Sequence, residues 1–242
     1  MSTAGIAIIG NEILSGKVQD ENAPFLLREL RALGVEVLRV NTIPDVVPII
    51  ASDVRSFSDA FSYVLTSGGV GPTHDDVTME GVAAAFGRRV VRDPRMGAML
   101  RGALRGREPN ESHLKMTELP EGSELIETPD LWFPLVKVEN VFVFPGIPRL
   151  LQAKFNGARE RFVGRKIHLR KLFLACIETD IAGDLNAVVA AFPELQIGSY
   201  PRIGEDSFRT LVTLESRDEA YVLRGLDALV GRIPADYVIK VE

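Results

Sequence analysis

A glycine-rich run contains the residues of this sequence best suited to chemistry. Residues 66–78 read TSGGVGPTHDDVT and lie where a buried strand is expected to end and a helix to begin. Closely spaced glycines let backbone N–H groups approach a ligand, and the start of the helix adds donors and a positive dipole end that favour phosphate. The residues of this run that are predicted to contact a ligand are Thr66, Gly68, Gly69, Gly71 and Thr73.

Two carboxylates, Asp75 and Asp76, follow the glycines directly. Acids beside a phosphate are explained if a divalent cation such as Mg²⁺, Mn²⁺ or Co²⁺ lies between them, because such ions are usually held by one or two carboxylates and by phosphate oxygens. The simpler interpretation is that Asp76 only caps the helix and the glycines only form a turn. The density of the run favours a metal and phosphate site, with Asp75 and Asp76 as metal ligands and Asp76 as a catalytic residue.

Polar residues also follow the first two strands expected in the chain. Asn11 and Glu12 come after the first strand, and Asp45 comes after the second. In a parallel sheet these positions meet the glycine-rich run beyond the carboxyl ends of the strands. Asp45 is therefore predicted to join Asp76 as a metal ligand or catalytic base. Asn11 and Glu12 are predicted to contact the ligand. A turn role for Asp45, after Pro44, is equally compatible with the residues alone.

Three other features carry weaker signals. His74 could be a ligand, a general acid or a loop residue. Between Arg88 and Arg107 there are seven arginines and one acid, Asp93, which fits either a solvated helical face or a flap that contacts phosphate. Cys176 alternates with leucines and fits a core position, and because it is the single cysteine, an internal disulfide is excluded.

The composition is that of an ordinary globular protein. The 242 residues are 46% hydrophobic and 25% charged, with a formal charge of -5. No run approaches the roughly 18 apolar residues of a membrane span, and the N-terminal residues show no secretory signal. The modest negative charge provides no strong field for nucleic acid or acidic membranes. We therefore expect a cytoplasmic protein whose partners are small molecules or its own copies.

Alternating strands and helices position the glycine-rich run. Apolar runs predict strands at 5–9, 35–40 and 63–66, and apolar spacing predicts helices at 22–33, which Asn22 could cap, and at 49–61. Strands that are apolar on both faces and alternate with helices are typical of a parallel sheet covered on both sides. The predicted fold class is therefore α/β, with three layers (α/β/α) around a mostly parallel sheet.

The remaining chain is predicted to complete this domain and to add a smaller one. Helices are expected at 77–86, 94–104 and 149–162, a short strand at 89–91, and a hairpin from strands 135–138 and 141–144. After residue 165 the pattern is β-α-β-β-α-β, the order of a small α+β ferredoxin-like sandwich. Its strands are expected at 169–177, 196–200, 207–215 and 237–241, and its helices at 184–191 and 218–230. The predicted domains are 1–165 and 166–242.

Four motifs, in the same order along the chain, carry a family resemblance. The run from Gly68 to Thr78 resembles the signature of the molybdopterin-binding-like family and, within it, the N-terminal domains of CinA-type proteins and of eukaryotic FAD synthases. Residues 10–17 (GNEILSGK), together with Asn22, resemble the family's first loop, and Asp45 falls where members carry a strand-end aspartate. Residues 133–148 resemble its closing hairpin. The resemblance covers about residues 4–165 and implies a Rossmann-like nucleotide-binding domain.

The resemblance also implies an activity. It points to metal-dependent hydrolysis of a nucleotide pyrophosphate such as ADP-ribose or FAD, with Asp45 and Asp76 at positions important for activity. It also implies that Pro145 and Gly146 of the closing hairpin contribute to the binding site. One alternative is a non-hydrolytic pterin- or nucleotide-binding protein linked to molybdenum cofactor assembly, although Asp75 stands where the assembly enzymes resemble one another in having arginine. Another is a regulatory protein that has lost the chemistry.

Partners follow from the same comparison. The resemblance favours a homodimer, with a trimer as the other assembly found in the family. The small C-terminal domain resembles the KH-like domain of CinA-type proteins, but residues 166–242 contain no G-x-x-G loop and carry a net charge of -3. Both facts argue against RNA as a partner.

Overall fold

A computed structural model of the protein describes residues 2–128, 131–204 and 207–242. It divides into two compact units, Met1–Arg165 and Lys166–Glu242. The first unit contains the glycine-rich run, and each unit is described by itself. Among the described residues, no helix has both the length and the apolar character that a membrane crossing requires.

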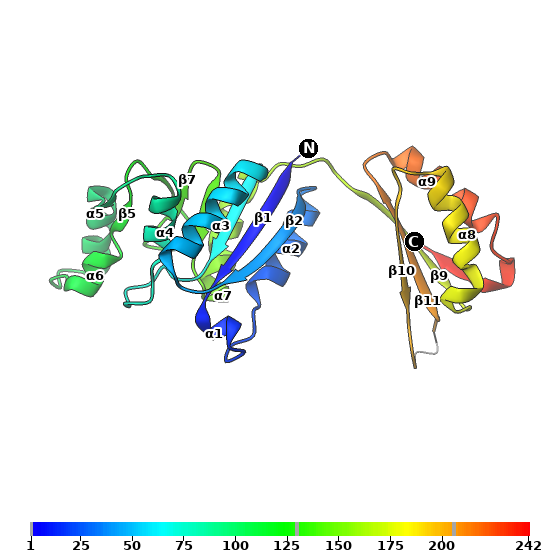
Figure 1. The fold of residues 1–242 in the computed structure, drawn as a ribbon, viewed down its shortest axis with the longest axis horizontal. Coiled ribbons are helices and arrows are strands. Elements are labelled where there is room, and N and C mark those ends of the chain that lie inside the picture. The colour runs from blue at the N-terminus through cyan, green and yellow to red at the C-terminus, as the bar shows by residue number, and fades with distance from the viewer. Residues whose placement is uncertain (1, 129–130, 205–206) are drawn as a thin grey trace. The chain divides into compact units, whose positions relative to one another are not determined.

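A six-stranded sheet forms the centre of the first unit (Figure 1). In sheet order its strands are β2 (Glu36–Ile43), β1 (Thr3–Ile9), β3 (Tyr63–Ser67), β8 (Val141–Phe144), β7 (Leu135–Val138) and β6 (Glu124–Ile126). Strands β2, β1, β3 and β8 run parallel, whereas β7 is antiparallel to both of its neighbours. The carboxyl ends of four parallel strands therefore meet at one edge. The sequence predicted this arrangement for β1, β2 and β3, whereas β8 was predicted only as part of a hairpin.

Helices cover both faces of this sheet, which confirms the predicted three-layer fold. On one face α2 (Asn22–Ala32) and α7 (Pro148–Ala158) pack against alternate residues of β1, and on the other face α3 (Val47–Ala60) and α4 (Thr78–Ala85) pack against the residues between them. Ile6 and Ile8 belong to the first core, Ala7 and Ile9 to the second. Strand β1 is apolar throughout because both of its faces are buried.

Several short elements complete the first unit. They are α1 (Asn11–Leu14), β4 (Val90–Arg92), α5 (Pro94–Leu104), α6 (Glu111–Lys115), β5 (Glu118–Pro120) and the 3₁₀ helix Arg159–Arg161. Strands β4 and β5 form a separate antiparallel pair. Helix α5 has its predicted bounds, because Asp93 accepts hydrogen bonds from the N–H groups of Arg95 and Met96 and a proline follows it.

The arginine-rich segment is a solvated, ion-paired surface rather than a free phosphate flap. Arg88 pairs with Glu139, Arg89 with Glu121, Arg92 with Glu111 and Glu118, and Arg95 with Asp93. Four of the seven arginines are therefore neutralised by carboxylates of this unit. The simpler of the two sequence interpretations is the one that the structure supports.

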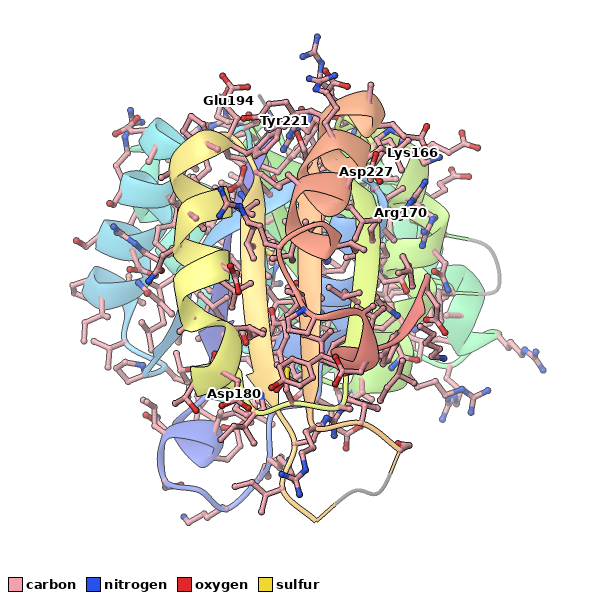
Figure 2. The ribbon with its side chains drawn as sticks, turned by 90° about the vertical axis from the view of Figure 1, so that its right-hand side faces the viewer. Lys166, Arg170, Asp180, Glu194, Tyr221 and Asp227 are labelled. Carbon is pink, nitrogen blue, oxygen red and sulfur yellow. The ribbon has the colours of Figure 1, made fainter. Side chains whose placement is uncertain are left out.

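The second unit has the predicted ferredoxin-like order. Its elements are β9 (His168–Leu174), α8 (Glu178–Ala191), β10 (Gln196–Pro201), β11 (Thr210–Ser216), α9 (Glu219–Val230), the 3₁₀ helix Ala235–Tyr237 and β12 (Val238–Val241). The strands form an antiparallel sheet in the order β10-β11-β9-β12. Figure 2 shows α8, between Asp180 and Glu194, side by side with α9, which carries Tyr221 and Asp227. Cys176 is buried in this unit's core, as expected.

Candidate functional site

The glycine-rich loop begins where β3 ends and is held between two neighbouring strands. Gly68 adopts φ +106°, and a Cβ atom added there would lie 2.0 Å from the carbonyl oxygen of Ile9 at the end of β1. Its N–H donates to the carbonyl of Phe144 at the end of β8, 3.1 Å away. Only glycine satisfies both this backbone conformation and this close approach.

Thr78 connects the loop to the first turn of α4. Its hydroxyl donates to the Gly68 carbonyl at 2.8 Å, and its N–H donates to the Gly69 carbonyl at 3.0 Å. The side chain is fully buried, and a Cβ atom on Gly69 would lie 2.4 Å from its Oγ1. Thr78 therefore fixes the loop against the helix. No role was predicted for Thr78, although its position two residues after the second aspartate could have indicated one.

Asp76 holds the far side of the loop and is not the cap of α4. The residue before the helix is Val77, and no side chain caps it. Instead, Asp76 Oδ2 accepts the N–H of Thr73 at 2.8 Å and also lies against the Thr73 hydroxyl. A Cβ atom on Gly71 would lie 2.6 Å from the same oxygen. The carboxylate therefore lies directly against the glycine-rich loop.

Asp75 is more exposed and lies on the outside of the same turn. The Thr73 hydroxyl is 2.6 Å from Asp75 Oδ1, and this hydrogen bond is the main cause that lowers the pKa of the Asp75 carboxyl below its usual value. The side chain of His74 is 97% exposed, and its Nδ1 lies 4.0 Å from Asp75. Asp75 is therefore ionised at neutral pH and lies at the mouth of the loop.

Asp45 lies between the first loop and the glycine-rich loop, as predicted. Its Oδ2 accepts the N–H of Asn11 at 2.7 Å, and its Oδ1 lies 3.4 Å from the Cβ position of Gly69. The Asn11 and Glu12 side chains are exposed at the start of α1, so Asn11 contributes its backbone to this contact. Thus Asp45 and Asp76 both line the loop, one beside Gly69 and one beside Gly71.

Asn22, predicted as a helix cap and as part of the family's first-loop motif, connects two segments at the site. The residue before α2 is Glu21, and Asp20 accepts the N–H groups of Asn22 and Ala23. The Asn22 amide is 6% exposed and donates to Ser67 Oγ at 2.9 Å and to the Gly146 carbonyl at 2.7 Å. Asn22 therefore connects Ser67, at the end of β3, to Gly146, in the segment that follows β8.

The two hairpin residues differ in exposure. Pro145 is buried, and its carbonyl is 3.4 Å from the Ser67 hydroxyl, which donates to it. Gly146 is exposed, and a Cβ atom added there would lie 3.3 Å from the Cα of Gly68. Pro145 and Gly146 thus border the glycine-rich loop, the position implied by the family resemblance.

Thr66 departs from its predicted role. It pairs with Ala7 and Val143 inside the sheet, its side chain is fully buried, and its Oγ1 is buried without a partner in the part of the chain that the structure describes. A hydroxyl enclosed in this way does not face a ligand at the loop. Thr66 lies one residue too early in the strand, before the chain reaches the sheet edge.

A cation approaches the loop from a distant segment. Lys115, at the end of α6, donates a hydrogen bond from Nζ to the carbonyl of Thr73. It lines a pocket of about 30 Å³ together with Gly69, Gly71, Asp76 and Glu80. A lysine here places positive charge beside the carboxylates, where a phosphate would need it. Sequence reasoning missed Lys115 because α6 is short and lies far from the glycines in the chain.

Whether Asp45 and Asp76 can hold a divalent cation depends on which of their carboxylate oxygens are free. Among residues 2–128, 131–204 and 207–242, no group of three or more His, Cys, Asp and Glu side chains is placed to hold a metal ion. Asp45 and Asp76 each use Oδ2 for a backbone N–H, and the described residues provide no hydrogen bond to either Oδ1. One or two carboxylate oxygens beside a phosphate cradle are what Mg²⁺ usually takes from a protein, so the residues fit a cation that arrives with its ligand.

Comparison with known proteins shows the family to which the chain belongs. Residues 5–159, more than half of the chain, match the family described as a probable molybdopterin binding domain. The chain belongs to this family. Residues 166–242 match the middle domain of FAD synthase.

Relatives of the whole chain and of its parts are known. A protein of Archaeoglobus fulgidus is 37% identical over 221 residues, which cover 91% of this chain and 93% of that protein. A probable FAD synthase of Caenorhabditis elegans is 33% identical over 262 residues, and the match covers 96% of this chain and 50% of that protein. The chain therefore spans about half the length of this FAD synthase relative.

A solved structure supports the fold of the family domain. The CinA protein of unknown function from Thermoplasma acidophilum superimposes with a TM-score of 0.62 at 29% identity, and covers 67% of this chain and 98% of its own. The family resemblance drawn from the four sequence motifs is thereby confirmed.

Proposed function

We propose that the chain hydrolyses the pyrophosphate bond of a nucleotide such as ADP-ribose or FAD with the help of a divalent cation. The observation that carries the proposal is the loop itself, which has Asp45 beside Gly69, Asp76 beside Gly71 and the Lys115 amine at Thr73. One small pocket is thus lined by Gly69, Gly71, Asp76 and Lys115, and Asp45 lies beside it against Gly69. The similarity to a probable FAD synthase and the membership of the probable molybdopterin binding domain family support a nucleotide- or pterin-type ligand.

In this proposal, positively polarised groups of the chain would bind the phosphate, and carboxylates would bind the cation. Backbone N–H groups of the loop and the first turn of α4 would receive the phosphate oxygens, and Lys115 would offset their negative charge. Asp45 and Asp76 would hold the cation through the oxygens that no N–H occupies. Either carboxylate could also accept a proton from the attacking water. When bound, the cation would neutralise charge that develops on the phosphoryl oxygens during attack.

A second candidate is a protein that binds a pterin or nucleotide without cleaving it. The observation that favours it is that Asp76 Oδ2 already accepts the N–H of Thr73 and lies against the Thr73 hydroxyl. In this case the loop would still bind phosphate, and Asp76 would serve only to hold Thr73 in place.

The experiment that separates the two candidates is a product assay on four pyrophosphate-containing nucleotides. ADP-ribose, FAD, NAD and coenzyme A would each be incubated with Mg²⁺, Mn²⁺ or Co²⁺ and with EDTA. Release of AMP, or of adenosine 3′,5′-bisphosphate from coenzyme A, would be measured. Asp76→Asn removes the charge at the loop. Asp59→Asn is the matched control, since Asp59 is exposed and pairs with Arg55 on α3.

The hydrolase proposal predicts a metal-dependent product from at least one nucleotide. Asp76→Asn is expected to lower its rate by on the order of a hundredfold, the usual cost of losing one electrostatic contact to a transition state. Asp59→Asn is expected to leave the rate unchanged. If no nucleotide is cleaved with any metal while one still binds, the second candidate replaces the first.

A further inference from the structure

A second pocket, the inner pocket, adjoins the pocket at the glycine-rich loop. The two share four lining residues, Val70, Met79, Met116 and Leu119. The inner pocket adds Met96, Phe133, Pro134, Val136, Val143, Pro145 and Lys154. The two pockets are therefore neighbours. The pocket at the loop has four charged residues in its lining, Asp76, Glu80, Lys115 and Glu118, whereas the described lining of the inner pocket has one, and this division suits a nucleotide with a phosphate end and a ring end.

Among the described residues that line this inner pocket, one side chain is charged, that of Lys154. It is 1% exposed. Its Nζ donates to the Phe133 carbonyl at 2.6 Å and lies 3.8 Å from the centroid of the Phe133 ring. A lysine amine offers further hydrogen-bonding positions, and the described residues supply no second acceptor for this one. Burial lowers its pKa to about 7, so near neutral pH a large fraction is uncharged and tolerates an apolar neighbour.

The other lining residues suit a flat aromatic ring. Met79, Met96 and Met116 are unbranched and polarisable, and thioethers make favourable contacts with aromatic rings. The inner pocket now holds about 30 Å³ of free space, so a ring would enter by rotation of these flexible side chains. Phe133 supplies an aromatic face beside the amine.

We propose that the inner pocket binds the planar heterocycle of the nucleotide, and that Lys154 hydrogen-bonds to a ring carbonyl of a flavin or pterin. The inference rests on the proposed function, because it takes the pyrophosphate at the glycine-rich loop as the other end of the same ligand. It adds a preference for a ring that carries a carbonyl. Adenine has an amino group in place of a carbonyl, and we therefore expect it to benefit less from Lys154.

The test is a calorimetric titration of the full chain with four probes in the presence of EDTA, so that no turnover is needed. The probes are FMN and neopterin, whose rings carry carbonyls, AMP, whose ring does not, and inorganic pyrophosphate, which has no ring. Trp132 offers a second readout, because it is the single tryptophan and its ring lies 5.3 Å from that of Phe133. A bound flavin should quench its fluorescence.

Three variants make the test specific to Lys154. Lys154→Met keeps the length of the side chain and removes the amine, and Lys154→Gln restores a donor. Lys137→Met is the matched control, because Lys137 also lies near an aromatic ring, that of Phe142, but outside the pocket. Lys154→Met is expected to weaken FMN and neopterin binding about fivefold to tenfold, the effect of one hydrogen bond, with partial recovery in Lys154→Gln. AMP and pyrophosphate affinities should change less than twofold.

The outcomes separate the two proposals. If FMN and neopterin bind no more tightly than pyrophosphate, or if Lys154→Met matches Lys137→Met for every probe, the inner pocket is not the ring site and the inference is overturned. If pyrophosphate fails to bind even when Mg²⁺ replaces EDTA, while FMN binds in a Lys154-dependent way, the ring site stands and the phosphate role of the loop is wrong. A loss of all four affinities in Lys154→Met would mean that the amine shapes the whole site rather than contacting the ring, and would also overturn the inference.

Discussion

Pockets lie at two opposite edges of the same sheet, and the two edges differ in how their charged side chains are paired. At the amino ends of β3 and β8 a pocket of about 680 Å³ is lined by Arg55, Ser58, Phe86, Arg88, Glu139 and Asn140. Here the arginines pair with carboxylates, Arg55 with Asp59 and Arg88 with Glu139. Asn140 is equally satisfied, because its amide donates to the carbonyls of Ser58 and Phe61.

At the carboxyl ends the pockets are far smaller, about 30 Å³ each, yet their charges are less satisfied. Asp45 and Asp76 accept backbone N–H groups and make no ion pair within the described residues, and Lys115 donates to a carbonyl. Pocket volume alone would favour the amino edge, whereas the proposed site lies at the carboxyl edge. Charges held by backbone groups remain available to a ligand, whereas charges already paired must first be separated.

The largest expected effect concerns the close approach that shapes the carboxyl edge. Gly68→Ala forces a Cβ atom against the Ile9 carbonyl at a positive φ, so we expect a loss of about 4 kcal/mol in the free energy of unfolding. Gly87→Ala is the control, because Gly87 also has a positive φ but no atom lies within 4 Å of its Cβ position. Its expected cost is about 1 kcal/mol. Urea unfolding measures both, and equal losses would contradict the packing of the loop.

The next effect is a pH dependence at the inner pocket. Because burial lowers the pKa of Lys154 from 10.5 to about 7, the unfolded chain binds one more proton than the folded chain between these values. Stability from this group is therefore full above pH 10.5 and is lost as the pH falls toward 7. Lys154→Met should be more stable than the wild type by about 2 kcal/mol at pH 6.

Paired unfolding curves test this pH dependence. The difference between Lys154→Met and the wild type should shrink steadily as the pH rises from 7 to 10.5, the window set by the two pKa values. Lys137→Met provides the same comparison for a lysine that pairs with Glu124. A difference that does not change with pH would show that the Lys154 amine stays charged in the folded protein.

A smaller effect separates positioning of the loop from general stability. Thr78→Val removes the hydroxyl that bonds the Gly68 carbonyl, and Thr210→Val removes an equally buried hydroxyl that bonds the Cys176 carbonyl at the same 2.8 Å. Each should cost about 1 to 2 kcal/mol of unfolding free energy. Only Thr78→Val is expected to weaken binding of pyrophosphate. Equal binding by both variants would mean that Thr78 does not position the loop.

The smallest effect is expected at the amino edge. Arg88→Gln breaks the ion pair with Glu139, whose side chain is 55% exposed, so the cost should be about 0.5 kcal/mol or less. Nucleotide binding should not change. Thermal unfolding and a binding titration of this variant check both statements, and a marked loss of affinity would move the site to the amino edge.

The fold could be predicted wherever burial dictates the sequence. The apolar run of β1 and the Asp93-Pro94 start of α5 each carry a local physical signal, and both elements formed as expected. The three-residue strands β5 and β6 were not predicted, because they depend on partners distant in the chain.

The candidate site was predictable only in part, for a related reason. Asp45 and Asp76 follow strand ends, so topology alone brings them to one edge. Lys115, Asn22 and Thr78 act through contacts that the chain makes only after folding. Thr66 was assigned to the ligand because it adjoins the glycines, but the strand continues through it and buries its side chain.

The most direct test of the central claim is amide chemical-shift mapping of ADP-ribose on the ¹⁵N-labelled protein, since it needs no turnover. The account predicts the largest shifts at Gly69, Gly71 and Thr73, with little change at Ser58 and Asn140. Asp76→Asn should reduce those shifts at the same ligand concentration. Shifts concentrated at Ser58 and Asn140 would contradict the assignment of function to the carboxyl edge of the sheet.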